Sequence, residues 1–190
     1  MAKTEKETGE LLLLAGIEEI EKNGIQNLSM RKLAARCGIS CAAPYKHYRN
    51  RDEFILEIIR YINRCWSDVQ RGIIKKCGKD ATTREILTEI SVGYIDFLVD
   101  HPNFRSIILM KDENEDHIRE KASVSDRTMD YIRAYCETVN MAEADKERKV
   151  FIIRSLIYGA AFLLDCGQLK KVPATYAMIR ECIMREFDLG

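Results

Sequence analysis

The chain has 190 residues, and its 30 Lys and Arg balance 30 Asp and Glu, so its formal net charge is zero. Taken over the whole chain, this balance disfavours a nucleic-acid binder, which usually carries a basic surplus. The uncharged run over residues 155–164 is too short to span a membrane. The first apolar stretch follows Glu5, Glu7 and Glu10 instead of the basic leader of a secretory signal. The sequence therefore predicts a cytoplasmic protein of one or two domains without a membrane partner.

Motifs for enzyme chemistry are missing from the sequence. The seven Cys are scattered and form no CxxC pair, and the three His form no HExxH motif. Glycine-rich phosphate loops and the GxSxG nucleophile motif are missing as well. We therefore expect reduced thiols, no catalytic residues, no metal site and no cofactor.

Apolar residues recur at helical spacing almost throughout, and only three Pro and ten Gly interrupt them. This pattern predicts an all-α protein. The expected helices end first at Gly24 and then cover about residues 30–37, 41–48, 51–77, 83–100, 102–110, 126–139, 145–168 and 173–188.

Capping signals support several of these helix starts. Ser29 and Ser40 stand where a hydroxyl can accept a hydrogen bond from the first turn. Asn50 and Thr82 are each followed three residues later by Glu, as in a capping box. Residues 111–125 are charge-dense, and their pattern does not distinguish a loop from a helix.

The neutral total hides an uneven distribution of charge. Residues 29–51 contain six basic residues and no Asp or Glu, which leaves 24 basic against 30 acidic residues elsewhere. The same stretch has the pattern of a helix–turn–helix, with the small Ala34 for close helix approach and Gly38 for a left-handed turn. A solvated charged face is the alternative. Because local cations supply most of the affinity for phosphate, this combination predicts DNA binding.

Three segments carry a resemblance to a known family. They are LLLAGIEEIEKNG, LSMRKLAARCGIS and CAAPYKHYRNRDEFILEI, and all lie within residues 12–58. Together they resemble the DNA-binding domain of the tetracycline-repressor (TetR) family. The resemblance implies a helix–turn–helix domain over residues 1–52. A connecting helix would join it to a larger helical bundle over residues 53–190 that binds a ligand and dimerises.

The resemblance also implies which residues contact DNA. They are Ser29, Arg31, Ser40, Cys41, Ala42, Ala43, Tyr45, Lys46, His47 and Arg51. Within this set Tyr45, His47 and Arg51 match phosphate-contacting positions, and Arg31 is placed to read guanine. Residues 41–43 are small, so specificity shifts toward Arg31, Lys46 and the shape of the DNA.

Tyr48, which follows these positions, and Cys41, which is one of them, each have a second interpretation. Tyr48 replaces the usual Phe of the family and is expected in the core. Cys41 follows a helix–turn–helix turn and lies near basic residues, an environment that lowers a thiol pKa. A redox role for Cys41 would be rejected if peroxide left DNA binding unchanged.

The implied effector site and dimer interface lie in the second part of the chain. The aromatic and Met candidates for the ligand site are Trp66, Tyr94, Phe97, Phe104, Met110, Tyr131, Tyr135, Tyr158 and Phe162. They suit an apolar or aromatic ligand, and the sequence shows no cluster that predicts an anionic one. The dimer candidates are Ile152, Leu156, Gly159, Ala160, Leu163, Met178 and Cys182. An ordinary monomer core is the alternative for both sets.

The function that follows is a ligand-responsive transcriptional regulator. We expect a repressor that binds a palindromic DNA operator as a homodimer and is released by a small-molecule effector. Three alternatives remain open. They are a DNA-binding or interaction protein without a switch, a helical enzyme with a basic substrate surface, and a helical module for an acidic partner or a membrane surface.

Overall fold

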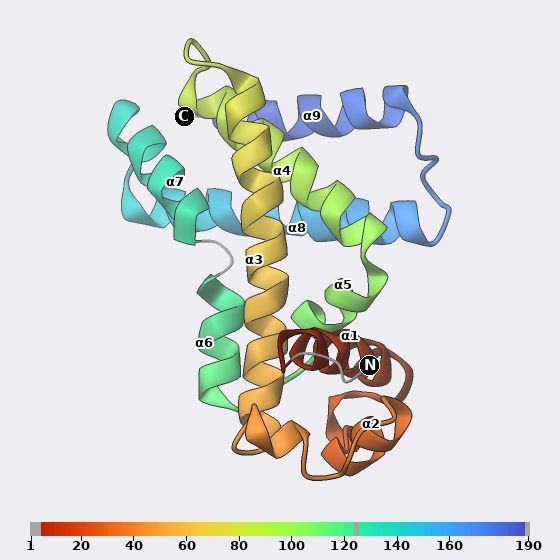
Figure 1. Ribbon diagram of the computed structural model, residues 1–190. Helices are drawn as coiled ribbons and strands as arrows, with labels where there is room; N and C mark the ends of the chain where they lie inside the picture. The colour runs from red at the N-terminus through yellow and green to blue at the C-terminus, as the bar shows by residue number, and fades with distance from the viewer. Residues whose placement is uncertain (1–4, 124–125, 189–190) are drawn as a thin grey trace. The chain divides into compact units, whose positions relative to one another are not determined.

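The computed structural model describes residues 5–123 and 126–188 and, within them, is built of helices with no strand (Figure 1). The all-α architecture expected from the sequence is therefore confirmed. The α-helices are α1 Glu5–Asn23, α2 Met30–Arg36, α3 Arg51–Cys77, α4 Thr83–Asp100, α5 Pro102–Leu109, α6 Glu115–Ser123, α7 Asp126–Thr138, α8 Glu143–Asp165 and α9 Pro173–Asp188. Two short 3-10 helices, Ile25–Asn27 and Pro44–Lys46, connect the first three.

Three of the four predicted caps, Ser29, Asn50 and Thr82, stand at helix starts, whereas no α-helix begins directly after Ser40. Thr82 and Glu85 form the complete capping box, with the Glu85 N–H 3.2 Å from the Thr82 hydroxyl and the Thr82 N–H 2.8 Å from the Glu85 carboxylate. The Asn50 side chain accepts from the Glu53 N–H at 2.8 Å, whereas the Glu53 carboxylate accepts from the N–H of Arg49 at 2.6 Å. The undecided segment 111–125 contains α6.

The prediction of an α-helix over residues 41–48 is wrong. This segment is a series of turns around the 3-10 helix Pro44–Lys46. The Ala43 N–H donates to the Ser40 carbonyl at 2.9 Å, and the His47 N–H donates to the Pro44 carbonyl at 3.0 Å. Because Pro44 has no N–H, it cannot donate to the Ser40 carbonyl as an α-helix would require. The tighter bonding of a 3-10 turn replaces it.

The chain divides into two compact units, which do not coincide with the expected boundary between residues 52 and 53. The first unit comprises the chain up to Arg64 together with Pro102–Ser123, and the second comprises Cys65–His101 with the chain after Ser123. The first unit extends into α3 because Phe54 and Ile58 are fully buried in its core. A Cβ added at Gly16 of α1 would lie 2.6 Å from the Phe54 ring, so the glycine permits this close approach.

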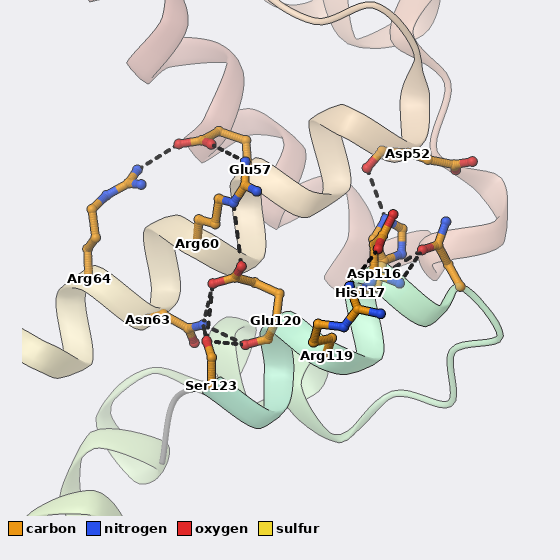
Figure 2. Close-up of polar contacts among 11 residues, drawn as sticks. Asp52, Glu57, Arg60, Asn63, Arg64, Asp116, His117, Arg119, Glu120 and Ser123 are labelled. Atoms are coloured by element: carbon orange, nitrogen blue, oxygen red, sulfur yellow. Dashed lines mark hydrogen bonds and ion pairs between the residues drawn. The ribbon is translucent and has the colours of Figure 1, made fainter. Parts of the chain in front are cut away.

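A polar seam between α3 and α6 completes the first unit (Figure 2). The Asn63 amide donates to the carbonyl of Glu120 at 2.8 Å, and the His117 Nε2 donates to the carbonyl of Asp52 at 2.9 Å. His117 Nδ1 lies 3.1 Å from a carboxylate oxygen of Asp112. This seam holds α6 against the first turns of α3.

Asp112 is the charged centre of that seam. Burial alone would raise the pKa of Asp112, but the Asn114 N–H, the Lys121 ammonium and His117 outweigh it and hold the pKa below its usual value. The Lys121 Nζ donates to the same Asp112 oxygen at 3.1 Å. The carboxylate of Asp112 is therefore kept ionised beside two basic groups.

The second unit is a bundle in which α4 packs against α7, α8 and α9. Ile95 and Leu98 of α4 and Ile183 of α9 are fully buried in its core. Arg180 of α9 donates to both carboxylate oxygens of Glu89 on α4, at 2.6 and 3.0 Å. Among the described residues, no helix is both long enough and apolar enough to cross a bilayer.

Candidate nucleic-acid interface and ligand cavity

The helix–turn–helix begins as the sequence predicts. The Ser29 hydroxyl accepts from the Lys32 N–H and caps α2, although at 3.4 Å the bond is long. Gly38 has a φ of 67°, in the left-handed region that it was expected to supply. Ala34 and Leu33 are buried, and Cys37 and Ile39 are half-buried beneath the turn.

Two of the six cations of residues 29–51 are committed to contacts within the first unit. Arg36 pairs with Glu18 and Glu19 of α1. Arg51, expected to bind phosphate, donates through Nε to the carbonyl of Leu28 at 3.1 Å and through Nη2 to the carbonyl of Ile25. The guanidinium of Arg51 thus fastens the start of α3 to the chain that precedes α2.

The other four cations are available to a phosphate backbone. They are Arg31, Lys32, Lys46 and Arg49, all exposed, and none forms an ion pair with any described residue. They come from the first turn of α2, from the 3-10 helix and from the chain just before α3. We call these residues the cation surface.

The remaining residues expected at DNA differ in exposure. Tyr45 is 54% exposed, and Ser40, Cys41 and Ala42 are also exposed, whereas Ser29, Ala43 and His47 are half-buried. The DNA contacts of these residues remain predictions. Tyr48 lies in the core as expected, with its ring centroid 4.8 Å from that of Phe54. Burial, with a smaller contribution from Glu57, raises the pKa of Tyr48 to about 12.

The second unit contains a cavity of about 130 Å³. Residues of α3, α4, α7, α8 and α9 line it, and most of them are apolar or aromatic. Four of the expected ligand residues are among them, namely Trp66, Tyr94, Tyr135 and Tyr158. The centroids of the Trp66 and Tyr94 rings are 4.6 Å apart, so the two rings form one continuous aromatic wall.

The other five expected ligand residues do not line this cavity. Phe104 and Met110 belong to the first unit, where Phe104 packs edge-on against Tyr61 with centroids 6.2 Å apart. Phe97 is buried in the second unit, behind the cavity lining. Tyr131 lies on α7 outside the lining, and Phe162 is 63% exposed. Their aromatic character alone could not distinguish core, surface and cavity.

Sequence reasoning missed the polar part of the cavity. Three cations of α8 line it, Lys146, Lys149 and Arg154, while the described lining contains no Asp or Glu. Only Lys146 and Lys149 have the three-residue spacing of neighbours on a helix, so the sequence alone did not group Arg154 with them. Lys149 is only 7% exposed and donates to the carbonyl of Glu186.

The expected dimer residues lie on α8 and α9 of the second unit. Gly159, Met178 and Cys182 are exposed, Ile152, Leu156 and Leu163 are half-buried, and Ala160 is buried in the unit itself. The same helices expose two large apolar side chains that were not selected for the interface. Phe151 of α8 is 70% exposed, and Phe162 is 63% exposed.

Comparison with known proteins shows what the first part of the chain is similar to. Residues 12–58 match the family model described as "Bacterial regulatory proteins, tetR family". No curated protein matches the sequence. Solved structures share the fold over nearly the whole chain. One is a TetR family transcription regulator from Marinobacter aquaeolei VT8, with a TM-score of 0.74, 15% identity and 94% coverage of each chain.

Two further structures are similar. A bacterial regulatory protein in the tetR family from Rhodococcus RHA1 has a TM-score of 0.74 and 16% identity, with 94% of this chain and 96% of that chain covered. The transcriptional regulator FadR from Bacillus subtilis, in complex with stearoyl-CoA, has a TM-score of 0.70 and 14% identity, with 93% and 98% covered. At these identities, the likeness establishes the fold.

Proposed function

Through residues 12–58 the chain belongs to the tetR family of bacterial regulatory proteins, and on this premise we propose that it is a ligand-responsive transcriptional repressor. It binds a palindromic DNA operator as a homodimer and leaves it when a small molecule occupies the cavity of the second unit. The cation surface is the single observation that carries this proposal.

The argument from the cation surface is electrostatic. Arg31, Lys32, Lys46 and Arg49 are exposed without a carboxylate partner among the described residues, beside the exposed Tyr45. Neutralising a DNA phosphate with such a side chain releases condensed counterions and supplies sequence-independent affinity. Arg31 adds the means to read a guanine edge in the major groove. An acidic remainder of the chain would keep other surfaces away from DNA.

Homodimerisation supports recognition of a palindrome because a two-fold symmetric dimer presents two helix–turn–helix units, one to each half-site. Phe151 and Phe162 leave large apolar surfaces on α8 that a monomer would expose to water. Gly159, exposed between them, would let a second helix approach closely. These features favour α8 as part of the surface that a second copy covers.

The effector part of the proposal rests on the cavity. A mostly apolar chamber with a few converging polar groups is the usual form of a small-molecule site. The Bacillus subtilis structure of the same fold contains stearoyl-CoA, which shows that this architecture accommodates a ligand with an apolar body in that protein. A ligand that prefers one arrangement of the dimer lowers the affinity for DNA by linkage, typically by about 1–3 kcal/mol.

Fluorescence anisotropy with palindromic DNA from the region beside its own gene tests the proposal. Lys46→Ala should weaken binding clearly, whereas Lys79→Ala, an exposed lysine of the second unit, should leave it unchanged. A reporter gene downstream of the bound palindrome should be silenced by the parent protein. Equal losses from both substitutions, or activation of the reporter, would overturn the respective part of the proposal.

A further inference from the structure

The polar groups of the cavity gather around the Tyr94 hydroxyl. This oxygen is buried and has no hydrogen-bond partner among the described residues. Burial raises the pKa of Tyr94, a contact with the Tyr158 hydroxyl raises it further, and the charge of Arg154 opposes the shift. The contact with Tyr158 falls outside hydrogen-bond geometry, so it leaves the Tyr94 hydroxyl available to a ligand. The phenol therefore stays neutral and keeps its proton to donate, and Tyr158 and Arg154 line the same cavity.

A buried hydroxyl without a partner costs free energy, roughly 1–3 kcal/mol, that a suitable acceptor would recover. Arg154 also lines the cavity, with an exposed side chain that forms no ion pair with a described residue, and can offer a ligand there a positive charge. Lys146 also lines the cavity, and its contact with Glu143 at 2.9 Å involves a carboxylate that is 73% exposed. An ion pair with so exposed a carboxylate contributes little free energy, so Lys146 can leave it for a ligand.

The rest of the cavity lining is apolar and suits an apolar part of a ligand. Trp66, Ile90, Met129 and Ile153 present apolar surface from four different helices. No described lining residue is acidic, so the lining itself offers no carboxylate to the cations of α8. An uncharged apolar ligand would leave Tyr94 without an acceptor and would gain nothing from Arg154.

We propose that the cavity binds an amphipathic carboxylic acid, its carboxylate held by Tyr94, Tyr158 and Arg154 and its aromatic or aliphatic body against Trp66. This inference rests on the proposed function, because it specifies the effector of the same switch. It replaces the sequence-based expectation of a purely apolar or aromatic effector. A guanidinium and a phenol hydroxyl suit a carboxylate because charge-assisted hydrogen bonds are about twice as strong as neutral ones.

The chain contains a single tryptophan, and it lines the cavity, so its fluorescence reports binding without DNA. Octanoate, dodecanoate, phenylacetate and phenylbutyrate would each be titrated beside the corresponding primary amide. At least one acid should bind saturably and about tenfold more tightly than its amide, as expected for one or two charge-assisted hydrogen bonds. Arg154→Gln and Tyr94→Phe should each remove most of that preference while the affinity for the amide is retained.

Arg148→Gln is the matched control, because Arg148 lies on the same helix, pairs with Asp145 at 2.9 Å and does not line the cavity. It should leave the preference for the acid unchanged. Equal binding of acid and amide, no saturable change with any of the acids, or equal loss for both ligands in Arg154→Gln would overturn the inference. Operator affinity is measured in a separate experiment. A negative result with the acids would therefore not contradict DNA binding, and a negative result with DNA would not contradict binding of a carboxylic acid.

Discussion

Replacing Arg51 with Ala separates a structural role from a DNA-contacting one. The guanidinium donates to the carbonyl of Leu28 at 3.1 Å and to that of Ile25, and its side chain is 34% exposed. The Ile25 carbonyl keeps a bond from the Leu28 N–H at 3.3 Å, so the loss falls mainly on the Leu28 carbonyl. A hydrogen bond to a charged group contributes about 1.5–3 kcal/mol, and partial exposure places the total cost at about 2 kcal/mol.

Urea unfolding followed by circular dichroism, at one fixed protein concentration, measures this cost. Arg49→Ala is the control, since Arg49 is exposed, is unpaired among the described residues and belongs to the cation surface. It should leave the free energy of unfolding unchanged within about 0.5 kcal/mol while weakening DNA binding. If Arg51→Ala unfolds like the parent protein and instead lowers the salt dependence of DNA binding by about one phosphate per protomer, the guanidinium contacts DNA and this reasoning is wrong.

Three further predictions concern packing, pH and assembly. Gly16→Ala would place a methyl group 2.6 Å from the Phe54 ring and should cost about 1–3 kcal/mol in unfolding experiments, whereas Gly9→Ala on the same helix meets nothing within 4 Å and should stabilise by up to about 1 kcal/mol. Because the pKa of Asp112 is lowered in the folded protein, its contribution to the free energy of unfolding is complete above about pH 4 and is lost as the pH falls through the pKa of the folded state. Asp112→Asn should therefore flatten the dependence of the free energy of unfolding on pH at acid pH. An unchanged dependence would contradict this. Phe151→Glu should convert the dimer to a monomer in sedimentation experiments without unfolding the second unit, and a persistent dimer would exclude this surface.

Local signals in the sequence were sufficient for most of the helices, but not for α6 or for the turns of residues 41–48. Thr82 and Asn50 cap helices because capping depends on residues within one turn of each other. Residues 41–48 fit the spacing of a helix, yet the missing N–H of Pro44 favours a 3-10 turn over a regular helix. The distinction depends on one hydrogen bond, which residue types alone do not determine.

The cavity and the seam could not be derived in the same way, because each joins residues that are distant in the chain. Arg154 becomes a candidate for the ligand site only because the fold brings it to the same cavity as Tyr94, which lies about 60 positions earlier in the chain. His117 was an isolated histidine in the sequence, and its bond to the Asp52 carbonyl spans 65 positions. Phe162 shows the converse, since an aromatic residue at helical spacing proved to be exposed.

The salt dependence of operator affinity tests the central claim most directly. For a palindrome selected from a random library, a dimer that uses Arg31, Lys32, Lys46 and Arg49 in both protomers should give a slope of log Kobs against log salt of about −7. Changing all four residues to Ala should bring the slope close to zero while the circular dichroism spectrum is retained. A slope that the fourfold variant leaves unchanged, or the absence of any selected sequence, would contradict the assignment of this surface to DNA.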